Sequence, residues 1–320
     1  MIKKLQRVST FLKIFFKNNK FILINSPLQF INLVEYYKKN NKLDTRLPVL
    51  IGFTNTISIS QIKYLNYYYF NFKNIFFLSN LFNHKIFHYI LFIRKRMSQF
   101  KFCIIGDLNY YLFNEFYKNT KKNIILDDGT GSLKVKNILP SKDTTIFTIF
   151  KNLKINKKTK YLENNFEKLK SMKKKQKIDK KKIYIIGSAS IEREFIRVDD
   201  FDIIINSILK KYKNKKIFYI PHRYESPFKN LKNFKKIIIK KYNYPIELAL
   251  IKEKHLPHEI LGFYTTALFN INKIFSRKIK IYNIEHGLDS LDNNSDRLKF
   301  RKIKKQFLFH KINKFEYIKK

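Results

Sequence analysis

The most informative short stretch of the chain is DDGTG, which begins at Asp127 and follows the apolar run at 124–126. The chain has only 7 glycines in 320 residues, so each glycine is expected where a side chain would obstruct the backbone. Gly129 and Gly131 would turn the chain sharply at the end of a strand. Asp127 and Asp128 would then be presented there, one toward a ligand and one as an anchor of the turn. A carboxylate so placed can act as a general base, and a solvated Asx turn is the alternative.

A histidine and an arginine follow a second apolar run, in IPHRYES at 220–226. Pro221 fixes the turn just before His222 and Arg223. An arginine can bind phosphate oxygens bidentately, and a histidine can donate a proton. The pair therefore suits a phosphate-bearing substrate. The alternative is that His222 is an ordinary surface or core residue whose hydrogen bonds are satisfied within the protein.

Two further turns offer hydroxyls and backbone N–H groups to an anion. In IIGSAS, Gly187, Ser188 and Ser190 lead into an expected helix N-terminus. In GFYTTALF, Thr265 and Thr266 stand where another helix could begin. Simple helix capping is the alternative in both places.

Asp200 and Asp202 have the D-x-D spacing that metal-dependent sugar transferases use. They open an expected helix instead of closing a strand, so they are interpreted as first-turn carboxylates favoured by the helix dipole. No metal site is predicted. The sequence also has no P-loop, dinucleotide-binding G-x-G-x-x-G or H-E-x-x-H pattern.

Short apolar runs must position these turns, and each run ends in a small, proline-containing or acidic turn. Segments of helical spacing lie between them, and such alternation predicts an α/β fold with parallel sheets. Parallel sheets bind ligands beyond the carboxyl ends of their strands, where all of these turns would lie. The runs span 21–29, 47–53, 102–107, 124–131, 183–190, 217–222 and 280–287.

Changes in composition divide the chain into four parts. We expect an N-terminal domain at 1–150 and a C-terminal domain at 183–296. Between them, 151–182 carries 14 lysines and is interpreted as a solvated linker with some helix. The last segment, 297–320, mixes basic and apolar residues, and a helix there could lie on anionic lipid or fold back onto the protein.

The net charge of +43 comes mainly from lysines spread along the whole chain. A compositional bias, an anionic membrane surface and nucleic acid are three explanations; no nucleic-acid-binding motif supports the last. Cys103 is the only cysteine, which excludes an intramolecular disulfide framework and fits a reducing cytoplasm. Lysines interrupt every apolar run of the N-terminus, so the sequence predicts no signal peptide and no membrane span.

Taken in order, five motifs resemble the bacterial sialyltransferases of glycosyltransferase family 52 and the related polysialyltransferases. The resemblance implies a GT-B-like architecture of two Rossmann-like domains. It also implies metal-independent, inverting transfer of sialic acid from CMP-sialic acid to a glycan hydroxyl, typically the terminal galactose of lipooligosaccharide, without a cofactor. The motifs are INSPLQ (24–29), LDDGTGSL (126–133), IIGSAS (185–190), YIPHR (219–223) and GFYTTAL (262–268).

The resemblance also suggests which carboxylate is the base. Family 52 members carry an aspartate shortly after the Gly-Ser of the IIGSAS segment, where this chain has Ser190. That aspartate is the proposed base in family 52, whereas in polysialyltransferases an acidic residue of a DDG-like motif is assigned as the base. The hypothesis is therefore that Asp128 is the base, with Asp127 second and Glu192 third.

On the donor side, the resemblance implies that His222 protonates or hydrogen-bonds the leaving phosphate. Arg223, which stands where the family usually has proline, would hold that phosphate together with Thr265 and Thr266. Glu247 is a candidate for the cytidine ribose hydroxyls.

The leading interpretation is an enzyme at the inner face of the cytoplasmic membrane, acting on a lipid-linked glycan; the family resemblance is compatible with a homodimer. A polysialyltransferase, or another capsule glycosyltransferase that uses a CMP-activated sugar, is the alternative within enzymes. The competing class is a non-catalytic basic protein that binds nucleic acid or an anionic polymer through its lysines.

Overall fold

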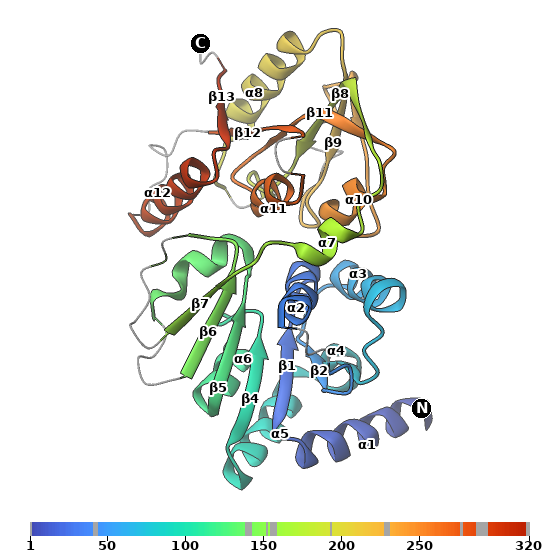
Figure 1. The fold of residues 1–320 in the computed structure, drawn as a ribbon, viewed down its shortest axis with the longest axis vertical. Coiled ribbons are helices and arrows are strands. Elements are labelled where there is room, and N and C mark those ends of the chain that lie inside the picture. Colours follow the sequence, from blue (N-terminus) through green and yellow to red (C-terminus); the bar gives the residue numbers. More distant parts are fainter. Residues whose placement is uncertain are drawn as a thin grey trace. The chain divides into compact units, whose positions relative to one another are not determined.

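The chain forms two compact units, Met1–Lys168 (unit 1) and Leu169–Lys320 (unit 2). The structure is a computed structural model, shown in Figure 1. Each unit contains its own parallel sheet with flanking helices. The residues it describes are 2–40, 44–137, 143–151, 153, 159–192, 194–226, 231–275, 278–285 and 294–317.

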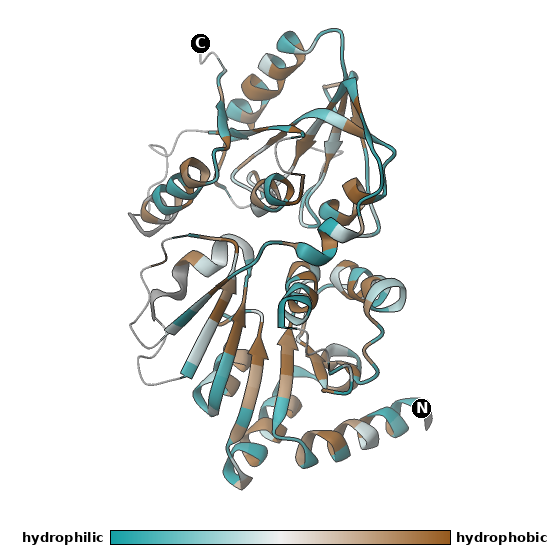
Figure 2. Cartoon of the chain, viewed as in Figure 1, coloured by the Kyte–Doolittle hydropathy of each residue, from teal (hydrophilic) through white to brown (hydrophobic). Residues whose placement is uncertain are grey.

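Unit 1 contains a seven-stranded parallel sheet with the order β3-β2-β1-β4-β5-β6-β7. Strands β1 and β4 are hydrophobic along most of their length, and β5 is hydrophobic at its carboxyl end (Figure 2), as expected for strand segments that are covered on both faces. The strands are β1 (Lys20–Ile24), β2 (Val49–Ile51), β3 (Ile75–Phe77), β4 (Phe100–Ile105), β5 (Thr120–Leu126), β6 (Asp143–Thr148) and β7 (Thr159–Glu163).

The helices of unit 1 bury a core rich in phenylalanine. Phe11 and Phe15 are fully buried and pack on Phe87, with ring centroids 6.1 and 6.0 Å apart. The elements are α1 (Ile2–Lys17), α2 (Pro27–Asn40), α3 (Thr56–Leu65), the π-helix η1 (Asn66–Phe70), α4 (Leu78–Leu81), α5 (His84–Met97), α6 (Tyr111–Lys118) and the 3-10 segment η2 (Gly129–Asn137).

Arg94 of α5 joins two helix ends in unit 1. Its buried guanidinium donates to the carbonyls of Phe15 at 3.3 Å and Asn18 at 2.9 Å, which are orphan acceptors at the end of α1. It also donates to the carbonyl and hydroxyl of Ser98 and lies 5.0 Å from the ring centroid of Phe100. These contacts fix α1 against α5.

Unit 2 contains a six-stranded parallel sheet with the order β10-β9-β8-β11-β12-β13. Its helix α8 buries Phe201, Ile204, Ile205 and Ile208, which share one helical face. The elements are β8 (Lys177–Ile186), α8 (Val198–Lys211), β9 (Lys216–Ile220), β10 (Ile237–Ile239), α10 (Ile246–Lys252), β11 (His255–Gly262), α11 (Thr266–Phe275), β12 (Lys280–Ile284), α12 (Asn294–Phe309) and β13 (Asn313–Phe315).

The predicted linker at 151–182 is instead largely structured. It supplies β7, the short helix α7 (Glu167–Ser171) and the first residues of β8, and the boundary between the units falls within α7. Lysine obscured these elements because β7 is an edge strand and the first half of β8 is mostly exposed. Residues 152 and 154–158 of the predicted linker lie outside the described residues.

The predicted tail at 297–320 folds back onto unit 2. Phe300, Ile303 and Phe307 of α12 are buried, and the ring of Phe307 stacks on Phe269 with centroids 4.3 Å apart. After α12, β13 joins the sheet beside β12. Phe300, Ile303 and Phe307 therefore belong to the core of unit 2 and do not lie on lipid, whereas Leu298, Leu308 and Phe309 are exposed.

Both sheets have the Rossmann strand order. Counted within each unit, the order is 3-2-1-4-5-6, and unit 1 adds a seventh strand at the β6 edge. The strand order reverses between β1 and β4 in unit 1 and between β8 and β11 in unit 2, and open α/β sheets bind ligands at such switch points. The predicted α/β class with two Rossmann-like sheets is confirmed.

Candidate functional site

The predicted turns lie at the carboxyl ends of the strands in both sheets. In unit 1, Asp127 follows β5 directly. In unit 2, Gly187 follows β8, Pro221 follows β9, and the turn to Thr265 follows β11. Each group therefore lies at the edge of its own sheet where ligands are expected.

Asp127 is an anchor inside unit 1. Its side chain is 2% exposed and accepts from the hydroxyls of Ser132 at 2.6 Å and Thr148 at 2.9 Å. It also accepts from the Ile149 amide at 3.0 Å. Burial raises the pKa of Asp127 to about 6, although these hydrogen bonds oppose the shift. A buried carboxylate with these partners holds the turn together.

Asp128 is half-buried and is oriented from two sides. Gln29 donates its Nε2 to Asp128 Oδ1 at 2.6 Å, and the Asp128 amide donates to Ser132 Oγ at 2.8 Å. Gly129 has φ 61°, the left-handed region that favours glycine. A Cβ on Gly131 would lie 2.9 Å from Asp128 Oδ2. The two glycines therefore shape the turn around the Asp128 carboxylate.

Gln29 is itself held by the loops at the switch point. It lies in the first turn of α2, where Ser26 Oγ accepts from the Gln29 amide at 3.3 Å as a helix cap. Its Oε1 accepts from the Asn25 amide at 2.8 Å, and a Cβ on Gly106 would come within 2.2 Å of that oxygen. Asn25 follows β1 and Gly106 follows β4, so both switch-point loops fix the group that orients Asp128.

In unit 2, backbone N–H groups converge on the carboxylate of Glu225. Oε1 accepts from the amides of Ser188 at 3.0 Å and Ala189 at 2.9 Å. Oε2 accepts from the His222 amide at 2.7 Å, and a Cβ on Gly187 would lie 1.9 Å from it. Burial raises the pKa of Glu225, against the effect of its hydrogen bonds. Glu225 thus joins the turn after β8 to the turn after β9.

His222 and Arg223 lie together in the turn after β9. His222 Nδ1 accepts from the Tyr224 amide at 3.3 Å, so in the neutral imidazole the proton is on Nε2. Arg223 Nε is buried and has no hydrogen-bond acceptor among the described residues. A buried donor without an acceptor is costly, and an anionic ligand would satisfy it.

Ser190 does not begin a helix, contrary to the prediction. The described residues between Ser190 and Arg197 form turns, and α8 begins at Val198. Ala189 and Glu194 have positive φ values of 54° and 58°, which a continuous α-helix does not allow. The Ser190 hydroxyl instead lies 2.6 Å from the Ser188 hydroxyl, beside the turn that Glu225 occupies.

The D-x-D aspartates lie on α8, as predicted. Asp200 is in the first turn and pairs with Arg197 at 3.0 Å, while Asp202 is two residues further along the helix. Among the described residues there is no group of three or more histidine, cysteine or acidic side chains that could hold a metal ion.

The other residues predicted to bind the sugar-nucleotide donor lie in the turn after β11 and in the helices α10 and α11. Thr265 Oγ1 accepts from the Ala267 amide at 3.4 Å, and Thr266 is the first residue of α11. Glu247, in the first turn of α10, is 5% exposed and accepts from Asn270 Nδ2 at 2.7 Å, and burial raises its pKa. This hydrogen bond joins α10 to α11 through the Glu247 side chain.

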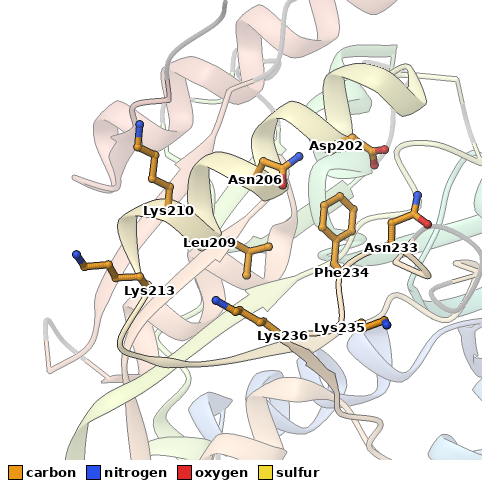
Figure 3. Close-up of a pocket in the computed structure, with 9 residues that line it drawn as sticks. All are labelled: Asp202, Asn206, Leu209, Lys210, Lys213, Asn233, Phe234, Lys235 and Lys236. Atoms are coloured by element: carbon orange, nitrogen blue, oxygen red, sulfur yellow. The ribbon is translucent and has the colours of Figure 1, made fainter.

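A lysine-rich groove lies on another part of unit 2. It runs along α8 beside the segment that precedes β10, and Figure 3 shows its ammonium groups projecting around it. None of the predicted catalytic or donor-binding residues lines it. The lining residues are Asp202, Asn206, Leu209, Lys210, Lys213, Asn233, Phe234, Lys235 and Lys236.

The sequence analysis assigned no role to Gln29 or Glu225, which position the predicted site residues. Gln29 lies within the INSPLQ motif and Glu225 within IPHRYES, so both were inside motifs already singled out. Their partners are 99 and 37 residues away in the chain. Only the strand order brings them together.

Comparison with family models and with curated proteins gives no match. The chain is similar to the solved UDP-GlcNAc 2-epimerase of Methanocaldococcus jannaschii, in complex with UDP-GlcNAc and UDP, with 13% identity, 90% of this chain and 92% of that chain covered, and a TM-score of 0.54. It is also similar to a Listeria monocytogenes protein described as a UDP-N-acetylglucosamine 2-epimerase, with 12% identity, coverage of 88% and 82%, and a TM-score of 0.51. Acinetobacter baumannii MurG aligns at 7% identity over 91% and 83%, with a TM-score of 0.47.

The likeness to the two epimerase structures extends over both units. Together with the strand order of each sheet, it shows that the chain has a GT-B-like α/β fold. Among the described residues, no helix is long and apolar enough to cross a membrane.

Proposed function

We propose that the chain is a nucleotide-sugar-dependent glycosyltransferase that transfers sialic acid from CMP-sialic acid to a glycan hydroxyl with inversion. The observation that carries the proposal is the Asp128 carboxylate, half-buried at the carboxyl end of β5 and oriented through one oxygen by Gln29. A rigidly oriented carboxylate at a ligand-binding edge suits a general base. The specificity for CMP-sialic acid is supported by the five sequence motifs.

In the proposed reaction, Asp128 takes the proton of the acceptor hydroxyl as its oxygen bonds to the anomeric carbon of the sugar. The bond from that carbon to the phosphate oxygen breaks, and its electron pair leaves with CMP. His222 Nε2, which carries the imidazole proton, donates to the leaving phosphate. Asp127 is assigned an anchoring role instead of a catalytic one, because its carboxylate is buried and already accepts hydrogen bonds from Ser132, Thr148 and Ile149.

On the donor side, Arg223 is proposed as the principal phosphate ligand. Its buried Nε has no acceptor within the described part of the chain, and a phosphate oxygen would satisfy it with a charge-assisted hydrogen bond. The hydroxyls of Ser188 and Ser190 and the start of α11 at Thr266 lie at the same sheet edge and would add neutral donors.

A UDP-sugar is the second candidate donor. The M. jannaschii structure that resembles this chain was solved with UDP-GlcNAc and UDP. Each unit of the present chain has the strand order on which mononucleotides are bound. A lipid-linked acceptor and a repeated, polymer-forming reaction are compatible with either donor.

The test is a nucleotide-release assay with purified protein, CMP-sialic acid or UDP-GlcNAc as donor, and lactose or galactose-terminated lipooligosaccharide as acceptor, in EDTA. Wild type should release CMP only when acceptor is present, and Asp128→Asn should not. Asp200→Asn is the matched control, because Asp200 is an aspartate in a first helical turn paired with Arg197. Release of UDP alone would replace the donor assignment, and release of neither nucleotide would contradict the proposed function.

A further inference from the structure

Helix α5 carries an apolar stripe on its solvent side. Ile86, Tyr89, Ile93 and Met97 are 50%, 66%, 38% and 63% exposed. They are spaced by three, four and four residues, so they lie along one face of the helix. Single exposed apolar residues are common on protein surfaces, but four large ones in a row on one helix form a contiguous apolar patch.

The core of unit 1 does not account for this stripe. A neighbouring face of α5 is the one that packs inward, through Phe87, Leu91 and Arg94, which are at most 2% exposed. An amphipathic helix of a globular protein normally has one apolar face and one polar face. The apolar surface of α5 is wider than the part that the core covers, and the stripe is the uncovered part.

The charged side chains that α5 itself contributes beside the stripe are all positive. The helix sequence HKIFHYILFIRKRM contains no aspartate or glutamate. Lys85 and Arg96 are exposed beside the stripe, and the guanidinium of Arg96 lies 4.3 Å from the ring centroid of Phe92, which is itself 42% exposed. Cations bordering exposed aromatic and aliphatic side chains are typical of surfaces that meet anionic lipid.

Helix α1 adds further cations next to α5. The two helices are joined through Phe11 and Phe15 of α1 and Phe87 of α5, and Figure 1 shows them at the same end of unit 1. The inward residues of α1 are aromatic, whereas its outer residues are mostly basic. The exposed cations are Lys3, Lys4, Arg7, Lys13 and Lys17.

We propose that α5 and the basic side of α1 form a docking surface for an anionic lipid bilayer. The apolar stripe would enter the interfacial region while the flanking lysines and arginines contact lipid phosphates. A second copy of the chain fits this face poorly, because a symmetric contact through α5 would bring the same cations together without a carboxylate from that helix to neutralise them. This inference is independent of the donor and of the reaction.

The chain has no tryptophan, so one introduced tryptophan reports its own surroundings. Tyr89→Trp places the reporter in the stripe. Ile238→Trp is the matched control, because Ile238 is 49% exposed on the edge strand β10 of unit 2. Vesicles of phosphatidylcholine with and without phosphatidylglycerol should blue-shift the emission of Tyr89→Trp only when the anionic lipid is present, and should leave Ile238→Trp unchanged.

Vesicle co-sedimentation supplies the second readout. The double change Ile86→Ser and Ile93→Ser should abolish co-sedimentation while circular dichroism stays as in wild type. Lys85→Ala and Arg96→Ala should each weaken binding to anionic vesicles about fivefold, the amount expected for one cation near such a surface.

Three outcomes would overturn the proposal. The first is that neither a blue shift nor co-sedimentation occurs with anionic vesicles. The second is that the Tyr89→Trp and Ile238→Trp emissions shift equally, which would place no special surface at α5. The third is a blue shift of Tyr89→Trp that follows protein concentration without vesicles, together with a dimer in light scattering; self-association would then cover the stripe.

Discussion

The sheets of the two units carry similar turns at their carboxyl ends, but these turns present groups of opposite chemical character. In unit 1, the buried Asp127 anchors a turn whose neighbouring carboxylate, Asp128, is half-buried at the edge. In unit 2, the anchoring carboxylate is Glu225, which joins two turns through backbone amides and leaves His222 and Arg223 beside it. One edge thus offers an acceptor of protons, and the other offers donors to an anion.

This difference teaches how two Rossmann-like sheets of the same strand order can carry different chemical groups at their ligand-binding edges. The strand order places the loops, but the residue that anchors each turn decides which group remains for the substrate. A carboxylate satisfied by buried hydroxyls leaves its neighbour, Asp128, as the base of the proposed reaction. A carboxylate satisfied by amides leaves an arginine whose Nε has no acceptor among the described residues.

The largest expected effect comes from removing the proposed base. Asp128→Asn keeps the shape and can still contact Gln29, but it cannot take a proton. We expect kcat to fall roughly a thousandfold, within the range for a general base, with the KM for the donor little changed. Steady-state kinetics of CMP release measure both constants. Normal kcat in this variant would remove the base from the unit 1 edge.

The next effect concerns stability and tests the anchoring role of Asp127. Its pKa is raised from 3.8 to about 6 in the folded protein, so the fold binds a proton there more tightly than the unfolded chain does. This group therefore contributes stability that is fully present below about pH 4 and is lost as the pH rises through about 6, a difference of about 3 kcal/mol.

Urea unfolding from pH 4 to pH 7 measures this difference. Asp127→Asn cannot titrate, so its stability should lack this share of the pH dependence seen in wild type. An identical pH dependence in both proteins would show that Asp127 is not the group responsible.

Arg223→Ala tests the donor edge. Losing a charge-assisted hydrogen bond to phosphate should raise the KM for the donor about 10- to 100-fold. Arg223→Lys should recover only part of this, because lysine lacks the planar fork of donors. Calorimetric titration with CMP gives the same comparison without turnover, and unchanged CMP affinity in both variants would place the phosphate elsewhere.

Glu225→Gln gives the smallest expected effect and sharpens the comparison most. Glutamine presents one acceptor oxygen, so the amides of Ser188 and His222 can no longer both be satisfied by it. The donor KM should rise roughly tenfold, the cost of one hydrogen bond to a charged group. A lower KM would mean instead that the Glu225 carboxylate competes with the donor phosphate for those amides.

Much of the fold was predictable from the sequence, because buried parallel strands are short continuous apolar runs that end in glycine, proline or acidic turns. The runs before DDGTG, IIGSAS and IPHR are β5, β8 and β9. Where lysine interrupts an edge or an exposed strand end, as in β7 and the start of β8, the pattern is lost and a linker was predicted wrongly.

The site was predictable as a set of turns but not as a set of contacts. The strand-end positions of Asp128 and His222 follow from the apolar runs before them. The roles of Gln29 and Glu225 depend on the crossover that places β1 beside β4 and on the neighbouring turns after β8 and β9. The turn at Ser190 was missed because left-handed Ala189 and Glu194 carry no glycine signal.

The division of chemistry between the two edges is the central claim, and one paired measurement tests it directly. CMP binding by calorimetry and CMP release with acceptor are measured for wild type, Asp128→Asn and Arg223→Ala. The account predicts that Asp128→Asn binds CMP as wild type does but releases it from CMP-sialic acid roughly a thousandfold more slowly, whereas Arg223→Ala binds CMP about 10- to 100-fold more weakly. An Asp128→Asn variant that turns over normally, or an Arg223→Ala variant that binds CMP normally, would contradict it.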